Sequence, residues 1–204
     1  KQVRGLLERY ACPVPYHEVR TRLLGNIATP VMSVLPLRVI QNLWGGELPE
    51  FESMDDANEL IGVLVDGLWN ALVRHQKRND PFRIIRVSPA PTRQGLCNLA
   101  LIRRQELDGF LNGLLSGQDG VDLPQKAKVA LNVLVDVRSM MAGVHDVAKD
   151  EATPSDAAQI EQTLRHVREL AVIMEKEINV VVLDCARSRR QSMSASGLPP
   201  PTIH

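Results

Sequence analysis

The sequence predicts an all-α fold, in which a compact helical N-terminal part is followed by a long antiparallel helical hairpin. Two segments, 122–149 and 153–190, place apolar residues at alternating steps of four and three, which is the spacing of a helix that packs lengthwise on another helix. Aromatic residues make up only 3% of the 204 residues, so the core must be aliphatic, as is typical of helix seams.

The segment 153–190 is expected to be the longest helix. Thr153 suits the N-cap, Pro154 suits the first helical position, and no Pro or Gly interrupts the run before Gly197. Its apolar series is Ile160, Leu164, Val167, Ala171, Met174, Ile178, Val181 and Cys185.

The segment from Asp122 supplies the second arm of the hairpin, with Asp122 as a candidate cap and Pro124 in the first turn. Its apolar series is Ala130, Leu134, Val137, Met141, Val144 and Ala148. Because the link at 149–153 is short, the two helices should be antiparallel neighbours. The two series are interpreted as core packing between the arms, and the alternative is a seam that also serves a second copy of the chain.

The chain is predicted to comprise a helical domain at 1–120, the hairpin at 121–190 and a flexible, Ser- and Pro-rich tail at 191–204. Within the first part, a helix is expected at 17–28. The inward-facing residues of this helix are Val19, Leu23, Leu24 and Ile27.

Two further helices are marked by their ends. Ser33 is expected to cap a short helix that Gly45 and Gly46 terminate in the left-handed conformation. Ser53 and Asp56 resemble a capping box, which begins a helix that lasts to about Lys77.

Residues 82–104 lose the helical pattern, and Pro89 and Pro91 exclude a long helix there. An extended strap is therefore expected. This segment has no acidic residue and contains a candidate basic patch formed by Arg83, Arg86, Arg93, Arg103 and Arg104.

A helix is predicted from about Arg103 to Ser116. Gly109 and Gly113 lie four positions apart on one face of it, with Asp108 and Asn112 beside them. Because glycine inside a helix lowers its stability by about 1 kcal/mol relative to alanine, a close helix approach is expected there. These four residues are the candidate interaction face.

Composition narrows the class of protein. The formal net charge is zero, from 24 basic and 24 acidic residues, which disfavours a dedicated nucleic-acid binder.

The three cysteines are far apart and form no CxxC motif, so a reducing, cytoplasmic location is expected. No signal peptide or run of 18 apolar residues is visible, so no membrane contact is expected. A chain that opens on Lys1 inside an apparent helix suggests a fragment.

The middle of the chain resembles the YecA/YgfB-like family of bacterial proteins over roughly residues 30–117. The resemblance lies in four motifs: LWGGELPEFE at 43–52, the helix DDANELIGVL at 55–64, NDPF at 79–82 and ELDGFLNG at 106–113. It implies a small, all-helical cytoplasmic protein that acts through protein contacts, and it implies no active-site residue. The Cys-rich zinc-binding tail of some members is absent from this sequence, and the long hairpin is not part of the pattern.

No catalytic, cofactor-binding or metal-ligating motif stands out. Cys12 and His17 are candidates for a thiol–imidazole pair, and His145 and His166 are candidate metal ligands at the closed end of the hairpin. Packing is the favoured interpretation for Cys12, and a solvated polar face for the two histidines.

The sequence therefore predicts a non-enzymatic helical protein without a cofactor, acting through contacts with another protein or a second copy of itself, with a regulatory role as one form of this function. The alternative is a nucleic-acid-associated helical protein that uses the basic segment 83–104.

Overall fold

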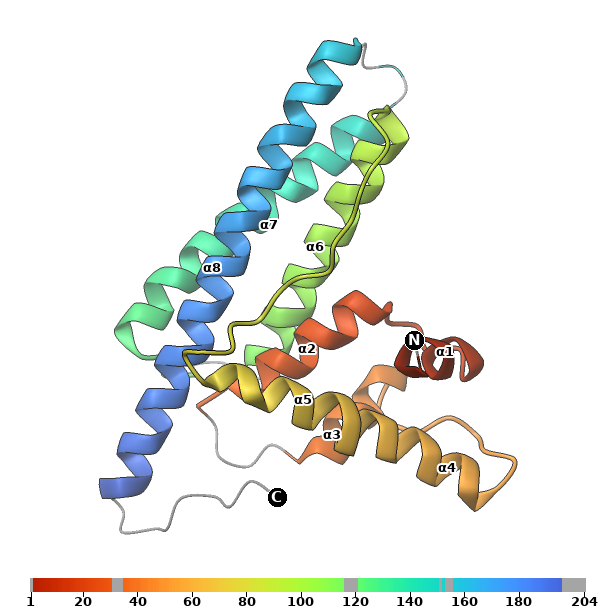
Figure 1. Ribbon diagram of the computed structural model, residues 1–204, viewed down its shortest axis with the longest axis vertical. Coiled ribbons are helices and arrows are strands. Elements are labelled where there is room, and N and C mark those ends of the chain that lie inside the picture. The colour runs from red at the N-terminus through yellow and green to blue at the C-terminus, as the bar shows by residue number, and fades with distance from the viewer. Residues whose placement is uncertain (1, 31–34, 116–120, 151, 153–155, 196–204) are drawn as a thin grey trace.

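The computed structural model describes residues 2–30, 35–115, 121–150, 152 and 156–195, and all regular secondary structure in these ranges is helical (Figure 1). The helical elements are α1 (Gln2–Arg9), α2 (Tyr16–Ala28), α3 (Pro36–Gln41), η1 (Asn42–Trp44), α4 (Met54–Ile61), η2 (Gly62–Trp69), α5 (Asn70–Val73), η3 (Arg74–Gln76), α6 (Arg93–Leu115), α7 (Gln125–Lys149) and α8 (Ala157–Ala195). The all-α prediction is confirmed.

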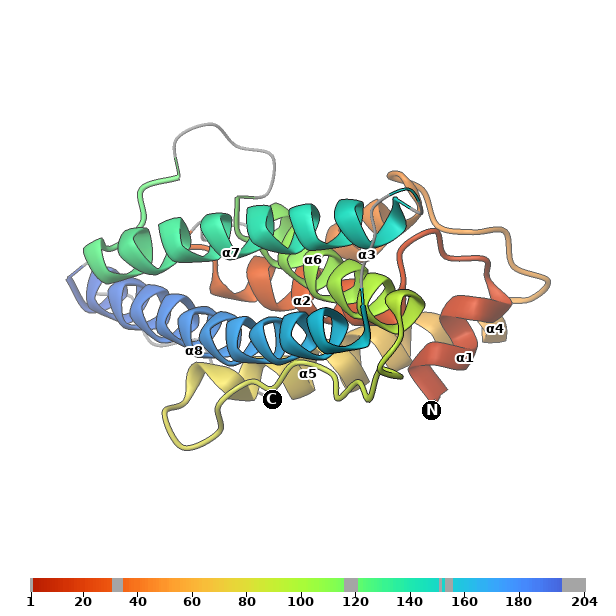
Figure 2. The same ribbon diagram turned by 90° about the horizontal axis from the view of Figure 1, so that it is seen from above.

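The three longest helices, α6, α7 and α8, pack together, and α2 crosses the C-terminal half of α6 (Figures 1 and 2). The most extensive helix contacts join α2 with α6, α6 with α7, and α7 with α8. Figure 2 shows α7 along one outer edge of the molecule and the rod from α4 to α5 on the opposite side of α8. One continuous cluster of buried side chains runs from Leu6 in α1 to Cys185 in α8.

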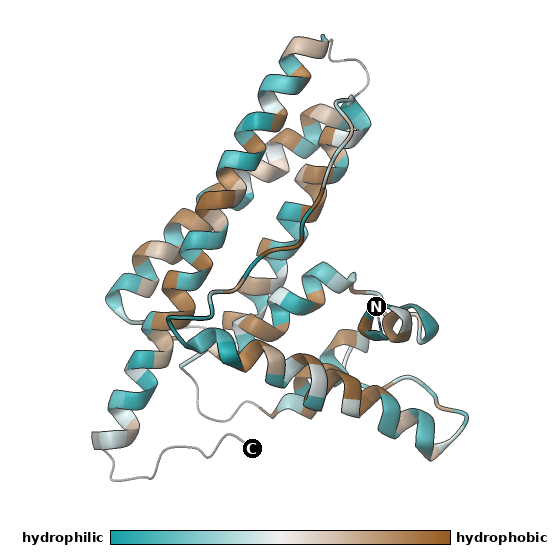
Figure 3. Cartoon of the chain, in the orientation of Figure 1, coloured by the Kyte–Doolittle hydropathy of each residue, from teal (hydrophilic) through white to brown (hydrophobic). Residues whose placement is uncertain are grey.

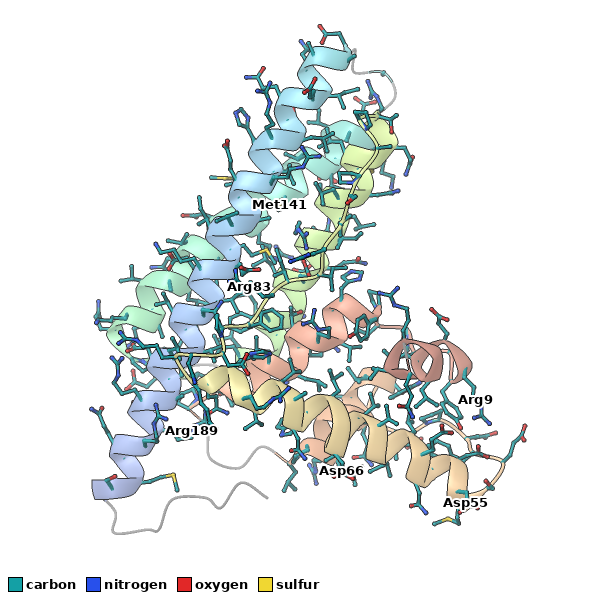
Figure 4. The ribbon with its side chains drawn as sticks, viewed as in Figure 1. Arg9, Asp55, Asp66, Arg83, Met141 and Arg189 are labelled. Atoms are coloured by element: carbon teal, nitrogen blue, oxygen red, sulfur yellow. The ribbon has the colours of Figure 1, made fainter. Side chains whose placement is uncertain are left out.

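The seam of the hairpin has the predicted register. Of the series on α8, every member except the half-buried Ile160 is buried, and of the series on α7, every member except the half-buried Val144 is buried. Met141, labelled in Figure 4, is fully enclosed. The period of 3.5 therefore identified the buried faces of both arms.

The ends of the hairpin differ from the prediction. Pro124 occupies the N-cap of α7, while Asp122 pairs with Lys128 at 2.9 Å instead of capping the helix. Asp156 accepts a 2.7 Å hydrogen bond from the Gln159 N–H in the first turn of α8, and the predicted cap Thr153 lies outside the described residues. At the other end α8 continues to Ala195, so the tail predicted from 191 is helical over its first five residues.

The short N-terminal helices follow their predicted signals. The expected helix at 17–28 is α2, and its four predicted inward residues are buried. Gly45 and Gly46 have φ angles of 87° and 115°, the left-handed conformation that ends η1. The predicted cap Ser33 lies outside the described residues, and Leu35 is the N-cap of α3.

The helix that begins at Ser53 is confirmed, but it is not regular throughout. The Ser53 Oγ accepts a 3.2 Å hydrogen bond from the Asp56 N–H, which completes the predicted cap. The rod then changes from α-helix to a π-helical segment at η2 before it returns to α-helix in α5. Figure 3 shows hydrophobic residues concentrated in the middle of this rod.

Helix α6 begins at Arg93, about ten residues earlier than predicted. The Thr92 Oγ1 accepts a 3.1 Å hydrogen bond from the Gly95 N–H and so caps the new N-terminus. A Cβ added at Gly95 would lie 2.1 Å from the Ala90 carbonyl oxygen, so the chain turns closely on itself where the strap meets the helix. The extended strap is thereby shortened to residues 81–90, and it runs between α6 and α8.

Candidate functional site

The candidate interaction face on α6 is largely covered by α2 of the same chain. A Cβ added at Gly109 would lie 2.5 Å from the Glu18 carbonyl oxygen, and one at Gly113 would lie 2.1 Å from the Arg22 carbonyl oxygen. On α2, a Cβ added at Gly25 would lie 2.3 Å from the Phe110 carbonyl oxygen. The expected close helix approach is therefore present, but its second helix is α2 rather than a partner protein.

The two polar residues of that face have different surroundings. Asp108 binds Arg138 of α7 and lies 3.6 Å from the Arg104 guanidinium, so it helps to join α6 to α7. Asn112 is exposed. Within the face predicted from the sequence, Asn112 alone retains an exposed side chain.

The five arginines of the candidate basic patch are distributed over two elements. Arg83 and Arg86 lie on the strap, while Arg93, Arg103 and Arg104 lie on α6. Arg93 donates a hydrogen bond to the Asp150 carbonyl oxygen at the closed end of the hairpin, far along α6 from the others. The patch is therefore divided, and Arg83 and Arg86 of the strap lie near Arg103 of α6 around one hollow.

Side chains of α6 and α8 hold the strap, because the described residues contain no strand that could pair with its extended backbone. Asn179 accepts a 2.8 Å hydrogen bond from the Phe82 N–H and donates one of 3.0 Å to the Phe82 carbonyl. Glu175 accepts from the Ile84 N–H at 3.2 Å and binds the Arg83 guanidinium. Backbone groups removed from water require such partners, so these side chains take the place of a neighbouring strand.

A buried ion pair lies under the middle of the strap. Glu106 binds Arg103 through one oxygen and accepts a 3.0 Å hydrogen bond from the Ile85 N–H through the other. Arg103 in turn donates to the Ile85 carbonyl at 2.9 Å. Burial raises the pKa of Glu106, and the charge of Arg103 acts against that rise. The pair fixes the strap to α6, and this role explains why two charged residues are buried there.

Cys12 and His17 form no thiol–imidazole pair. The Cys12 thiol lies 4.0 Å from the Leu43 carbonyl oxygen, whereas the His17 Nε2 lies 2.8 Å from the Gln105 Oε1. Burial raises the pKa of Cys12 and lowers the pKa of His17, so the thiol is not activated as a nucleophile.

The two histidines near the closed end of the hairpin do not gather metal ligands. His145 lies 3.1 Å from the Asp146 carboxylate, and His166 is exposed. Among the described residues, no group of three histidine, cysteine, aspartate or glutamate side chains is placed to hold a metal ion.

A second apolar series on α7 faces outward, and reasoning from the sequence missed it. Val129, Met140 and Val147 are 56%, 52% and 59% exposed, and Val133 is half-buried. Asp136 and Gly143 complete the same line. Its positions alternate by four and three residues, and each one directly precedes a residue of the buried seam in the sequence. We call the six residues the outward stripe. The same spacing rule would have found it, had it been applied to both faces of α7.

Open hollows lie beside the hairpin. One of about 450 Å³ is at the closed end, between Leu96 of α6, Val144 of α7 and Ile160 of α8. Another, of about 710 Å³, lies between the strap and α8 and is lined by Arg83, Arg86, Arg103 and Arg168 together with Glu175 and Ser88.

Comparison with protein-family models, curated protein sequences and solved structures gives no match for this chain. The resemblance to YecA/YgfB-like proteins therefore stays a prediction. In the described ranges, no helix is both long enough and apolar enough to cross a membrane, and Figure 3 shows hydrophilic and hydrophobic residues alternating along α6 and α8. Cys12, Cys97 and Cys185 are all free thiols.

Proposed function

We propose that this is a non-enzymatic helical protein that acts through protein contacts, and that its first partner is a second copy of the chain. The observation that carries the proposal is the outward stripe of α7. Four of its six positions are apolar, and three of these are more than half exposed. Exposed apolar residues at heptad spacing form the kind of surface by which helices associate lengthwise.

The stripe is symmetric about its centre near residue 138, so two copies of α7 can pair antiparallel around a two-fold axis. Such a contact is isologous, because each copy supplies the same surface. The residues that then face each other across the axis are Val129 with Val147, Val133 with Gly143, and Asp136 with Met140. A Cβ added at Gly143 would meet no atom within 4 Å, so this position leaves room for a side chain from the other copy.

Charges at the two ends of the stripe favour the antiparallel orientation. The same spacing extends the line to Lys126 at its start and Asp150 at its end. Antiparallel pairing brings each lysine opposite the aspartate of the other copy, whereas parallel pairing would bring like charges together. Asp136, near the centre, weakens the association and helps to fix its register, as single polar residues do in helical seams.

Sedimentation velocity over a series of protein concentrations tests this proposal. We expect a reversible dimer, which Met140→Glu weakens by about tenfold or more in dissociation constant, equivalent to about 1.4 kcal/mol. Val172→Glu is the matched control, because Val172 is 70% exposed on α8 and lies outside the stripe. Circular dichroism should give the same helix content for both variants.

A protein that stays monomeric up to millimolar concentration would reject the second copy as partner. A dimer that Met140→Glu leaves unchanged would reject the outward stripe as its interface.

The contacts of the basic segment 83–104 disfavour nucleic-acid association as the function. Arg103 is buried against Glu106, Arg83 is paired with Glu175, and Arg104 lies beside Asp108. These contacts leave too little free basic surface on the segment for a phosphate backbone. For the compartment we propose the cytoplasm, where free thiols such as those of this chain persist.

A further inference from the structure

Four arginines line the hollow between the strap and α8. Arg83 and Arg86 come from the strap, Arg103 from α6 and Arg168 from α8, and Glu175 is the acidic residue of the lining. Segments far apart in the sequence therefore bring positive charge to one place, in a chain whose formal net charge is zero.

The carboxylates nearest to this hollow are already bound within the protein. Glu175 uses its two oxygens for the Arg83 guanidinium and the Ile84 N–H. Glu106, behind the strap, uses its two for Arg103 and the Ile85 N–H. Neither carboxylate is left to neutralise the other arginines.

Arg86 and Arg168 supply the unbalanced charge. Both are exposed, and in the described part of the chain neither forms an ion pair with an acidic side chain. On α8, the residues three and four positions from Arg168 include no acidic residue. Two arginines from different elements therefore line the same open volume, and neither has an ion-pair partner in the described part of the chain.

The strap adds hydrogen-bond donors to this charge. Its N–H groups at Phe82, Ile84 and Ile85 are bound by side chains of α6 and α8. Those of Arg86, Val87 and Ser88 find no acceptor within the described residues. Arg86, Val87 and Ser88 all line the hollow, so their N–H groups and the Ser88 hydroxyl are donors close to it.

We propose that the hollow between the strap and α8 is a binding site for a compact phosphate-bearing small molecule, held by Arg86 and Arg168. Guanidinium groups bind phosphate oxygens in pairs of parallel hydrogen bonds, which makes arginine the preferred residue for such recognition. The volume of about 710 Å³ lies in the range of small-molecule sites.

A compact ligand fits the charge distribution better than a nucleic acid does. Binding a polymer needs a basic surface that extends along many phosphates. Here Arg93 and Arg104 of the same basic segment are engaged elsewhere, with Asp150 and beside Asp108. The free charge is therefore confined to one hollow. This proposal is independent of the contact through α7.

Isothermal titration calorimetry with inorganic pyrophosphate at constant ionic strength tests the site. We expect the wild-type protein to bind pyrophosphate, and the double variant Arg86→Gln/Arg168→Gln to raise the dissociation constant by at least about tenfold. The double variant Arg187→Gln/Arg190→Gln is the matched control, because it removes two exposed arginines of α8 outside the hollow. It should bind as the wild type does.

Three results would overturn the proposal. One is the absence of pyrophosphate binding below about 1 mM, and another is equal binding by the Arg86/Arg168 double variant. The third is binding of a 20-nucleotide single strand at a concentration where pyrophosphate does not bind, since this would indicate a nucleic-acid surface instead. Thermal unfolding of each variant shows whether it is folded, and if the double variant is not, Arg168→Gln alone replaces it.

Discussion

The α2–α6 crossing and the α7–α8 hairpin are both helix pairs, but they are built on different contacts. In the crossing, Gly25, Gly109 and Gly113 bring two backbones together, and no side chain separates them at these positions. In the hairpin, residues such as Leu134 and Leu164 keep the helix axes apart and fill the space between them. The first contact needs the absence of a Cβ at particular positions, whereas the second needs apolar volume at a regular period.

The two contacts should therefore respond differently to small changes of side chain. A seam of leucines and valines can relax around a lost methyl group, at a free-energy cost that depends on the remaining cavity. A backbone contact has no such freedom, because the atoms that would clash are carbonyl groups held in a helix. The crossing should be the more sensitive region to added atoms, and the hairpin to removed ones.

The largest effect is expected from adding one methyl group to the crossing. Gly113→Ala places a Cβ 2.1 Å from the Arg22 carbonyl oxygen, so α2 and α6 must move apart. We expect a loss of about 4 kcal/mol or more in the free energy of unfolding, measured by urea denaturation. Gly5→Ala is the control, since a Cβ there meets no atom within 4 Å. This change should raise the free energy of unfolding by about 0.5–1 kcal/mol, because alanine is favoured over glycine inside a helix. Equal effects of the two changes would contradict a tight crossing.

Substitutions in the hairpin should lower the free energy of unfolding less, and the sensitive substitutions there are those that remove apolar atoms. Leu164 is 1% exposed in the seam, so Leu164→Ala should lower the free energy of unfolding by about 2–5 kcal/mol. Val172→Ala, at a position that is 70% exposed, should change it by less than about 0.5 kcal/mol. A loss at Leu164 as small as that at Val172 would place Leu164 outside the core.

A hydrogen bond from α8 to the end of α2 links the two regions and allows their coupling to be measured. Arg189 of α8 donates a 2.7 Å hydrogen bond to the Ile27 carbonyl at the end of α2 (Figure 4). Arg189→Ala should destabilise the protein by about 1.5–3 kcal/mol, the range for hydrogen bonds of charged groups. Arg187→Ala removes a half-exposed guanidinium that lies 3.5 Å from Asp184, and it should have an effect below about 1 kcal/mol.

A double-mutant cycle then tests whether this bond joins the crossing to the hairpin. Combining Arg189→Ala with Gly25→Ala should give a loss smaller than the sum of the single losses, because both changes disturb the same end of α2. Strict additivity would show that the bond and the crossing are independent.

The smallest expected effect on stability comes from ionisation of the Cys185 thiol, which lies at the end of the seam. Burial, followed by the charge of Asp184, raises the pKa of Cys185 to about 12. The unfolded chain then loses its thiol proton at lower pH than the folded chain does. Stability should be unaffected by this group below pH 8 and should fall above about pH 9, by at most about 1.4 kcal/mol per pH unit.

Urea denaturation between pH 7 and 10 checks this expectation. Cys185→Ala should reduce the decrease at high pH, and the part that remains would reflect Cys12, whose pKa burial also raises. Identical pH profiles of the two proteins would show that the Cys185 thiol ionises as easily in the folded state as in the unfolded one.

The all-α class, the buried faces of the hairpin and the helix ends at Ser53 and Gly45 could all be predicted from local residue patterns. These features depend on neighbours within a few turns of one chain segment, and the side-chain period reports them directly. The close approach at Gly109 and Gly113 was also predictable, because glycine at two successive turns of a helix has a free-energy cost that packing must offset.

Which segments contact one another became clear from the folded chain alone. The tertiary structure placed α2 on the glycine face of α6, began α6 at Arg93, and paired Arg83 with Glu175 across 92 positions of sequence. It also brought Arg86 and Arg168 to one hollow. The spacing of apolar residues indicates which face of a helix must be buried. Which helix packs against that face depends on how all the helices bury their apolar surfaces together. That choice is a property of the whole fold, so no local pattern in the chain encodes it.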